Sequence, residues 1–306
     1  MSTVELENEV ASWRDYLELC KPNVVLVMIV TSAIGMFMAV DAGSMVPMDV
    51  LVLGNLGIAL CAASAATINH LVDRRIDLKM ARTLNRPIAK GRVGSNQALT
   101  FSFVLGVAGM GILLVYINAL TAWLTLASLL GYAVVYTLYL KRATPQNIVI
   151  GGLAGAAPPL LGWTAVTNNV DGYGLLLVLI VFIWTPPHFW ALALHRKDEY
   201  AKADVPMLPV THGERYTKIH ILLYTLLLII VTVMPYLTGM SGWLYLLGAL
   251  VLGGGFLYWA IVLLLSDKPG LGMATFKYSI VYLLALFAIM LVDHYWIAPP
   301  LLGPAS

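Results

Sequence analysis

Nine long apolar runs dominate this sequence and constrain its fold more than any other feature. A helix rises about 1.5 Å per residue, so about 20 mostly apolar residues cross the roughly 30 Å hydrocarbon core of a membrane. The runs cover approximately residues 24–40, 50–68, 98–117, 119–140, 148–166, 175–194, 219–237, 243–265 and 278–292. Hydrophobic residues make up 60% of the chain and charged residues only 11%, which is unlike a soluble domain. The sequence therefore predicts an all-α integral membrane protein with nine transmembrane helices in one bundle.

The third and fourth runs follow each other with one predicted break. No charged residue interrupts the chain from Ala98 to Leu140, and this stretch is about twice as long as one crossing requires. Asn118 lies at its middle. We therefore expect two spans joined by a tight turn at Asn118.

The positive charges sort onto one side of this nine-span arrangement. When the N-terminus is placed inside, all 18 Lys and Arg residues fall before the first span or in the loops after spans two, four, six and eight. The opposite loops carry only acids, namely Asp41, Asp49, Asp171 and Asp293. Because Lys and Arg gather in short cytoplasmic loops, the sequence predicts an N-terminus inside and a C-terminus outside.

The two ends of the chain fall outside the predicted bundle. Residues 1–21 are polar and acidic with a few large apolar side chains, which predicts a cytoplasmic segment with a short amphipathic helix at the membrane surface; a frayed, solvated tail is the alternative. The segment lacks the features of a signal or transit peptide, which favours a bacterial plasma membrane over a mitochondrial one. We expect residues 22–297 to form the single transmembrane domain and residues 298–306 to be a short periplasmic tail.

Charge and cysteine content exclude several functions. The 18 Lys and Arg residues nearly balance the 16 Asp and Glu residues, so no excess charge would attract a nucleic acid. Cys20 and Cys61 are too few for a disulfide framework or a multi-cysteine zinc site. We therefore look for chemistry among the polar residues at the ends of the spans.

The first polar cluster lies where the second span ends. Asn69, Asp73 and Asp77 are spaced four residues apart and therefore stack on one face of a helix. Such oxygen ligands suit Mg²⁺, which takes its remaining ligands from water and substrate phosphates. Basic residues surround the acids: Arg74, Arg75, Lys79, Arg82, Arg86, Lys90 and Arg92. The cluster predicts a site for a metal ion and a polyanion; the alternative is an ordinary cytoplasmic loop whose acids pair with its bases.

A second polar cluster, residues 195–218, lies where the sixth span ends. Its acids Asp198, Glu199 and Asp204 stand beside the bases Arg196, Lys197 and Lys202. Asp73 and Asp198 are four spans apart and follow spans that insert in the same direction. This placement is expected if spans one to four and five to eight are similar halves that face a common cavity.

Polar side chains inside the spans are few. His188 lies within the sixth span, where an ionisable residue is a functional candidate; a structural, satisfied histidine is the alternative. Tyr132, Tyr136 and Tyr139 follow the fourth span toward the basic side. They predict either a wall of the cavity or a membrane-interface belt.

These motifs together resemble one family. The segment NHLVDRRID at residues 69–77, followed by RTLNRPIAKGRV, is similar to the first aspartate motif of the intramembrane aromatic prenyltransferase superfamily. The stretches GAAPPLLGW, TPPHFWALAL and PMLPVTHG resemble its haem O synthase branch. The likeness extends over nearly the whole chain. It implies nine helices around a cavity that opens to the cytoplasm, with Mg²⁺ bridging two aspartate motifs to an isoprenyl diphosphate.

The resemblance also implies roles for individual residues. Asn69, Asp73 and Asp77 would form the first metal site, with Asp73 and Asp77 catalytic. The second motif departs from the usual D-x-x-x-D pattern, because Asp198 matches the first acid, Lys202 takes the place of the second, and Asp204 follows two residues later. We expect Asp198 to be catalytic and to bind metal with Asp204. The diphosphate ligands would be Asn69, Arg82, Arg86, Arg92, Lys197 and Lys202, and the haem contacts His188, Tyr136 and Tyr139.

The reaction that the resemblance implies uses haem as a substrate rather than a cofactor. The farnesyl group of farnesyl diphosphate would be transferred to a vinyl group of haem B, with addition of water and release of diphosphate. Haem-handling or oxidase-assembly proteins would be partners. A prenyltransferase for a quinone or chlorophyll precursor is the nearer alternative, and a lipid or secondary transporter the more distant one. Transporters place charged sites near the bilayer midplane, whereas these acids lie at the cytoplasmic edge, which favours an enzyme.

Overall fold

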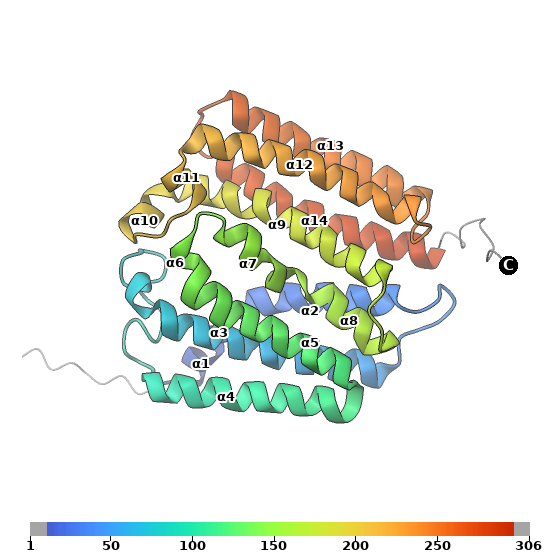
Figure 1. The fold of residues 1–306 in the computed structure, drawn as a ribbon, viewed down its shortest axis with the longest axis horizontal. Helices are drawn as coiled ribbons and strands as arrows, with labels where there is room; N and C mark the ends of the chain where they lie inside the picture. Colours follow the sequence, from blue (N-terminus) through green and yellow to red (C-terminus); the bar gives the residue numbers. More distant parts are fainter. Residues whose placement is uncertain (1–10, 297–306) are drawn as a thin grey trace, which may run out of the picture.

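The computed structural model describes residues 11–296, and every regular element in this range is helical (Figure 1). In chain order the elements are α1 (Trp13–Leu19), α2 (Pro22–Met38), η1 (Val50–Gly54), α3 (Asn55–Asp77), α4 (Ser95–Ile112), η2 (Leu113–Ile117), α5 (Ala119–Leu130), η3 (Gly131–Leu140), α6 (Lys141–Ala143), α7 (Asn147–Ala156), α8 (Pro158–Thr167), α9 (Gly172–His195), α10 (Lys197–Lys202), α11 (Leu208–Thr211), α12 (Glu214–Leu237), α13 (Trp243–Leu265) and α14 (Leu271–Trp296). The three η elements are π-helices. The predicted all-α class is confirmed for these residues, whereas the predicted features of residues 1–10 and 298–306 lie outside them.

Eight helical stretches of the described chain are long and apolar enough to cross a membrane. They are Val50–Asp77, Ser95–Ile117, Ala119–Ala143, Asn147–Thr167, Gly172–His195, Glu214–Leu237, Trp243–Leu265 and Leu271–Trp296. Helices α1 and α2 add a ninth when they are taken together, although they meet at an angle of 52°. The structure therefore contains eight or nine candidate spans, where the sequence predicts nine.

The predicted break at Asn118 is confirmed. This residue leaves the helical conformation and caps the start of α5, because its side-chain oxygen accepts a hydrogen bond from the Thr121 N–H at 2.8 Å. Its amide nitrogen donates to the Thr164 carbonyl of α8 at 2.9 Å. The hairpin turn is thereby attached to a neighbouring span.

Helix α1 packs against the start of α4 and the loop before it. Leu19 is fully buried against Ile88 and Val93 of that loop, whereas Trp13 is 70% exposed. Arg92 of the loop forms an ion pair with the buried Asp15 at 2.8 Å. Residues 13–19 therefore form a helix that is attached to the bundle through Leu19 and Asp15 and leaves Trp13 exposed.

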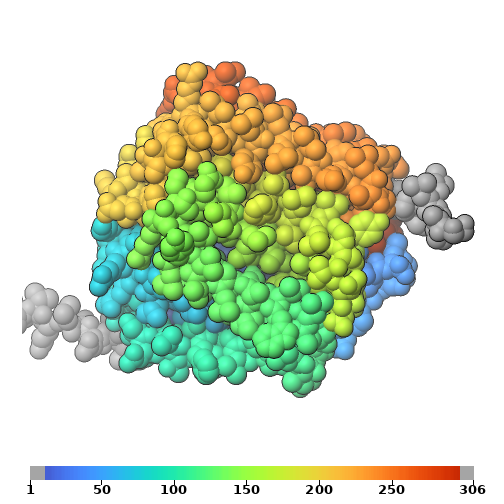
Figure 2. All heavy atoms as spheres, viewed as in Figure 1, coloured from blue at the N-terminus to red at the C-terminus, as the bar shows by residue number. Residues whose placement is uncertain are grey.

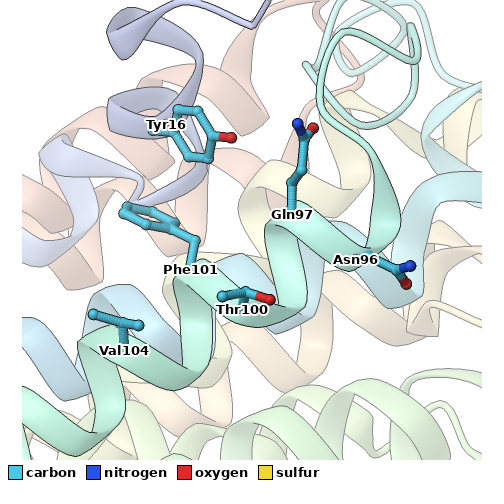
Figure 3. A pocket seen from close by; sticks show the side chains of 6 residues that line it. All are labelled: Tyr16, Asn96, Gln97, Thr100, Phe101 and Val104. Atoms are coloured by element: carbon cyan, nitrogen blue, oxygen red, sulfur yellow. The ribbon is translucent and has the colours of Figure 1, made fainter.

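A groove of about 510 Å³ runs between α1 and α4 (Figure 3). Tyr16 of α1 faces Phe101 of α4 there, with the two rings edge to face at 5.0 Å. The lining residues are Tyr16, Asn96, Gln97, Thr100, Phe101 and Val104. Figure 3 shows Asn96, Gln97, Thr100, Phe101 and Val104 all on the ribbon of α4. Most of these side chains are exposed, so the groove lies on the outer side of this helix pair.

The sharp bend between α1 and α2 occurs at Lys21. Its backbone is left-handed, with φ 50°, and the next residue is Pro22. Because a proline sterically disfavours the α conformation in the residue before it, α1 cannot continue into α2. The bend brings the Lys21 ammonium group to Asn69 of α3, to which it donates a hydrogen bond.

Helices α2 and α8 approach each other closely at two glycines. A Cβ atom at Gly35 would lie 1.9 Å from the Pro159 carbonyl oxygen, and one at Gly162 would lie 1.9 Å from that of Ser32. No larger side chain fits at either position. The small-residue stretch around Pro159 therefore serves the close packing that is common between membrane helices.

The long helices lie side by side, and the short elements α6, α10 and α11 gather at one end of the bundle (Figure 1). The loop between α3 and α4 lies at the same end. In the space-filling view, the green α5–α7 segment lies between the cyan α3 region and the orange α12–α13 region (Figure 2). The two polar clusters that the sequence places at span ends are therefore at the same end of the molecule.

Candidate active site

The first polar cluster is buried at the end of α3. Asn69, Asp73 and Asp77 are only 3%, 1% and 3% exposed. The Asn69 amide donates to the Asp73 carboxylate at 2.9 Å, which confirms that these side chains share one helical face. Carboxylates taken out of water need compensating partners, so the neighbouring charges define what this cluster can do.

Three cations supply this compensation. Lys141 donates to Asp73 Oδ2 at 2.6 Å, and Lys21 donates to Asn69 Oδ1. Arg86 holds both oxygens of Asp77, at 2.8 and 2.9 Å. Arg86 is a predicted site residue, whereas sequence reasoning missed Lys21 and Lys141. Both lysines stand at the cytoplasmic ends of predicted spans, at the same depth as Asp73, and that shared depth is the signal that could have identified them.

Span four presents two tyrosines to this cluster. The rings of Tyr132 and Tyr136 stack at 5.5 Å, and the Tyr132 hydroxyl lies 3.5 Å from the Lys21 ammonium group. Thr137 accepts a hydrogen bond from the Asn69 amide at 3.2 Å. Tyr136 also lies against Gly151 of α7, where a Cβ atom would be 2.2 Å from its ring.

Tyr139 does not join this stack. Its side chain is 67% exposed on the outside of the bundle. The reason is the π-helical register of η3, in which each turn contains more residues than an α-helical turn. Tyr132 and Tyr136 therefore stay aligned, whereas Tyr139 turns away from the face that regular α-helical spacing predicts for it.

The acids of the second cluster lie in three different environments. Asp198 is exposed on α10. Asp204 has a left-handed backbone, with φ 56°, and pairs with Lys79 at 2.7 Å on the surface. Glu199, by contrast, has a buried carboxylate oxygen, Oε2, that has no hydrogen-bond partner among the described residues.

The basic residues predicted to bind diphosphate are also spread over this end of the bundle. Arg82 lies close enough to Tyr200, Arg196 and Glu199 to interact with their charges: burial lowers its pKa, and the nearby Tyr200 and Glu199 oppose that shift. Burial likewise raises the pKa of the Tyr200 hydroxyl. The loop after α3 therefore meets the second cluster at Arg82.

Two further predicted diphosphate ligands are occupied by other partners. Arg92 pairs with Asp15 of α1, and Lys197 pairs with Glu214 at 3.0 Å. Lys202 is exposed at the end of α10. At this end of the molecule, Arg92 is held in a partly buried ion pair, Lys197 in a surface ion pair, and Lys202 is in solvent.

The residues present fit a divalent cation that shares its ligands with a substrate. Asp73 Oδ1 is buried and has no hydrogen-bond partner in residues 11–296, which is a costly state for a carboxylate oxygen unless a ligand reaches it. Within the same residues, no three His, Cys, Asp or Glu side chains converge as a metal cage. A Mg²⁺ ion here would thus need oxygens from outside the protein, as it commonly takes them from substrate phosphates.

His188 is separate from the acidic cluster and is held inside the bundle. It is 7% exposed and lies on α9 between aromatic side chains of α9 and α14. Its Nδ1 atom is 2.6 Å from the Ser279 hydroxyl. The structure therefore gives this histidine a fixed orientation, which sequence spacing could not show.

A bundle of apolar helices that gathers buried carboxylates, cations and tyrosines at one end defines a class of membrane-embedded enzymes that act on lipid-like anions. The comparisons with known proteins identify the family. The chain belongs to the UbiA prenyltransferase family, whose model matches residues 28–287.

Curated relatives match nearly the whole chain. It is 69% identical to the protoheme IX farnesyltransferase of Saccharophagus degradans, over 94% of this chain and 94% of that protein. It is 67% identical to the protoheme IX farnesyltransferase of Teredinibacter turnerae, over 95% of this chain and 93% of that protein. These similarities confirm the expected family and the branch that the motifs indicate.

Solved structures share the fold at low identity. A digeranylgeranylglyceryl phosphate synthase superposes with a TM-score of 0.77 at 19% identity, over 92% of this chain and 98% of that one. A UbiA homolog from Archaeoglobus fulgidus bound to GPP and Mg²⁺ superposes with a TM-score of 0.62 at 16% identity, over 90% of this chain and 99% of that one. These likenesses establish the arrangement of the helices.

Proposed function

We propose that this protein transfers the farnesyl group of farnesyl diphosphate to a vinyl group of haem B, with addition of water and release of diphosphate. The observation that carries the proposal is the buried Asp73, which keeps one oxygen free while the other accepts from Lys141 and from Asn69, in a chain 69% identical to a protoheme IX farnesyltransferase. The identity supports the pair of substrates. The buried cluster supports the diphosphate chemistry.

The first cluster would receive the diphosphate and its metal ion. Asn69, Asp73 and Asp77 are the proposed holders of Mg²⁺, and Asp73 offers the free oxygen. When bound, Mg²⁺ would supply a Lewis acid that stabilises negative charge on phosphate oxygens. Arg86 is oriented by both oxygens of Asp77, so Asp77 prepares a cation for the diphosphate as well as an oxygen ligand.

The cations act on the leaving group. When the bond between C1 of the farnesyl chain and the diphosphate oxygen breaks, its electron pair stays with the diphosphate. The Lys21, Lys141 and Arg86 side chains are already held in place and can donate hydrogen bonds to those oxygens as the charge develops. Preorganised donors of this kind stabilise the transition state because they need no reorientation.

The remaining diphosphate contacts are proposed from the second cluster and the loop after α3. Asp198 and Asp204 are proposed as metal ligands, and Arg82, Arg92, Lys197 and Lys202 as phosphate ligands. We add Glu199 to this set, because its buried and unpartnered Oε2 makes it the α10 carboxylate most in need of a cation. For these contacts to form, Arg92 would have to leave its partly buried ion pair with Asp15, and the surface ion pairs Lys79–Asp204 and Lys197–Glu214 would have to open.

The aromatic pair Tyr132 and Tyr136 is suited to protect the allylic cation. Their rings stack on each other, and the Lys21 ammonium group lies over the Tyr132 ring, 6.0 Å from its centroid. An apolar wall there keeps water from capturing the cation before the vinyl carbon attacks. The new carbon–carbon bond moves the positive charge to the former vinyl group, where water adds and releases a proton. Tyr136, Tyr139 and His188 are the proposed haem contacts.

The proposed orientation follows from the charges. Nine spans with the N-terminus inside would place every Lys and Arg, and thus the site, on the cytoplasmic side of a bacterial plasma membrane. Residues 22–297 would be the catalytic domain, preceded by the cytoplasmic segment 1–21 and followed by the periplasmic tail 298–306. Haem-handling or oxidase-assembly proteins are the proposed partners.

The experiment that tests the proposal supplies the purified protein with farnesyl diphosphate and either haem B or 4-hydroxybenzoate. We expect a farnesylated, hydrated haem by mass spectrometry, together with an equal amount of diphosphate. A chelator should stop both, and added Mg²⁺ should restore them. A farnesylated 4-hydroxybenzoate would support the quinone-precursor alternative, and no diphosphate release with either acceptor would favour a transporter.

A further inference from the structure

His188 is clamped on both faces of its ring. Trp184, one turn earlier on α9, stacks at 4.1 Å between centroids with an interplanar angle of 22°, and Phe276 of α14 stacks at 4.5 Å and 30°. Two rings this close and this parallel to the imidazole cannot share one face without overlapping, so they cover opposite faces. The ring can therefore offer only its edges to other groups.

One of those edges is fixed by Ser279 of α14. The Ser279 hydroxyl lies 2.6 Å from His188 Nδ1 and donates its own proton to the Phe276 carbonyl at 2.6 Å. The Ser279 carbonyl accepts a hydrogen bond from the Trp184 indole at 2.8 Å, so one residue holds both the histidine and the ring stacked on it. Ser279 is fully buried.

The hydrogen bonds determine the tautomer of His188. A serine hydroxyl has one proton, and here the Phe276 carbonyl takes it. The short contact to Nδ1 therefore needs a proton on the histidine side, so Nδ1–H donates to the Ser279 oxygen. A neutral imidazole carries a single N–H, which leaves Nε2 unprotonated.

The second edge of His188 is without a partner. No described residue makes a hydrogen bond to Nε2, and the ring retains 7% of its exposure. A histidine that binds a metal through one nitrogen almost always donates its other N–H to an oxygen, which fixes the ring and raises the basicity of the ligating nitrogen. His188 and Ser279 have this arrangement before any ligand is present.

We propose that His188 Nε2 binds the iron of haem and that Ser279 is the positioning residue that sets its tautomer. This inference rests on the proposed function, because it takes haem as the substrate. Coordination would fix the centre of the macrocycle against α9. Rotation about the iron–nitrogen bond would then set the positions of the vinyl groups.

The test uses the full-length protein in detergent, titrated with haem B alone, without farnesyl diphosphate. The readouts are the dissociation constant from the Soret band and the iron–imidazole stretching band of the ferrous complex in resonance Raman spectra. We expect His188→Ala to lose this stretching band. Imidazole added to His188→Gly should restore it.

Ser279→Ala tests the positioning role. We expect it to keep haem binding but to shift the iron–imidazole band and to weaken affinity about 10-fold or more, as loss of a second partner of a metal ligand typically does. Thr275→Val is the matched control, because it also removes a hydroxyl group from a fully buried residue of α14. Like Ser279, Thr275 donates a hydrogen bond to a carbonyl of its own helix, that of Leu271. Thr275→Val should leave the band unchanged.

The outcomes separate this inference from the proposed function. An iron–imidazole band that survives in His188→Ala, or that is identical in Ser279→Ala and the unaltered protein, would overturn the inference even if the protein still farnesylates haem. Conversely, a band that depends on His188 in a protein that farnesylates no haem would support the binding site and refute the proposed reaction. Size-exclusion profiles of each variant identify misfolding, and imidazole rescue of His188→Gly then decides the case.

Discussion

The close approach of Gly151 to Tyr136 predicts that a single methyl group will disable the site. In Gly151→Ala, the new Cβ atom would lie 2.2 Å from Cδ2 of the Tyr136 ring, 2.9 Å from Cε2 and 3.0 Å from Cγ. Ordinary contacts are 3.4–4 Å, so the ring has to retreat by roughly 1 Å or more. Cγ of Tyr136 is bonded to its Cβ atom, so displacing the ring must also move this Cβ atom or the backbone of η3.

The expected effects follow from that displacement. Overpacking a well-packed interior typically costs about 1–3 kcal/mol, which we expect as a lower melting temperature. Misplacing a group that shapes the reacting geometry by about 1 Å can cost roughly 100-fold in rate, so kcat for haem farnesylation should fall by about that factor. Because the diphosphate cations Lys21 and Lys141 are not touched, KM for farnesyl diphosphate should change much less than kcat.

The matched control lies one turn further along the same helix. Gly155→Ala introduces the same methyl group on α7 at a position where no atom lies within 4 Å, and we expect unchanged turnover. Initial rates and thermal melts of both variants make the comparison. If Gly151→Ala turned over within twofold of the unaltered protein, Tyr136 would not be part of the catalytic wall and the reasoning would fail.

Three further predictions concern charge. Asp73→Asn should lower diphosphate release by about 100-fold or more and also destabilise the protein, since it leaves the Lys141 ammonium buried without its anion; a variant with normal release would contradict the site. Glu199→Gln should reduce turnover more than Asp198→Asn, because of these two carboxylates only Glu199 has a buried, unpartnered oxygen. A larger loss in Asp198→Asn would instead assign the metal-binding role to Asp198. The pKa of Asp15 is lowered because the Ser12 backbone N–H donates to it and Arg92 pairs with it. A carboxyl group whose pKa is lowered by folding stabilises the protein at pH values above its unfolded pKa of 3.8, and this stabilisation is lost as the pH falls through the folded pKa. The difference in melting temperature between the unaltered protein and Asp15→Asn should therefore shrink below about pH 4. A difference that is constant with pH would refute this account.

The fold was largely predictable because its determinants are local. Long apolar runs, the polar break at Asn118 and the four-residue spacing of the aspartates each act within one or two helical turns. The structure confirms the break and the shared helical face. It differs at Tyr139, because η3 is a π-helix, and the α-helical spacing assumed from the sequence does not hold there.

The site was predictable only in part, for the same reason. The aspartate motif is visible in sequence, but its cations are not, since Lys21 and Lys141 are far from Asp73 along the chain and meet it only through packing. Ser279 shows no signal at all, because an isolated serine in a span is common and its role depends on His188 of another helix. The environments of Asp198, Glu199 and Asp204 likewise depend on how α10 folds back, which spacing alone does not determine.

The left-handed backbone at Lys21 connects the surface helix α1 directly to the proposed reaction centre. Asp15 holds α1 to the loop through its ion pair with Arg92. Lys21, two residues after the end of α1, donates a hydrogen bond to Asn69. Shortening the chain to begin at α2 would remove α1, with which α2 makes the ninth candidate span, and would also withdraw one of the few positive charges within reach of the buried aspartates.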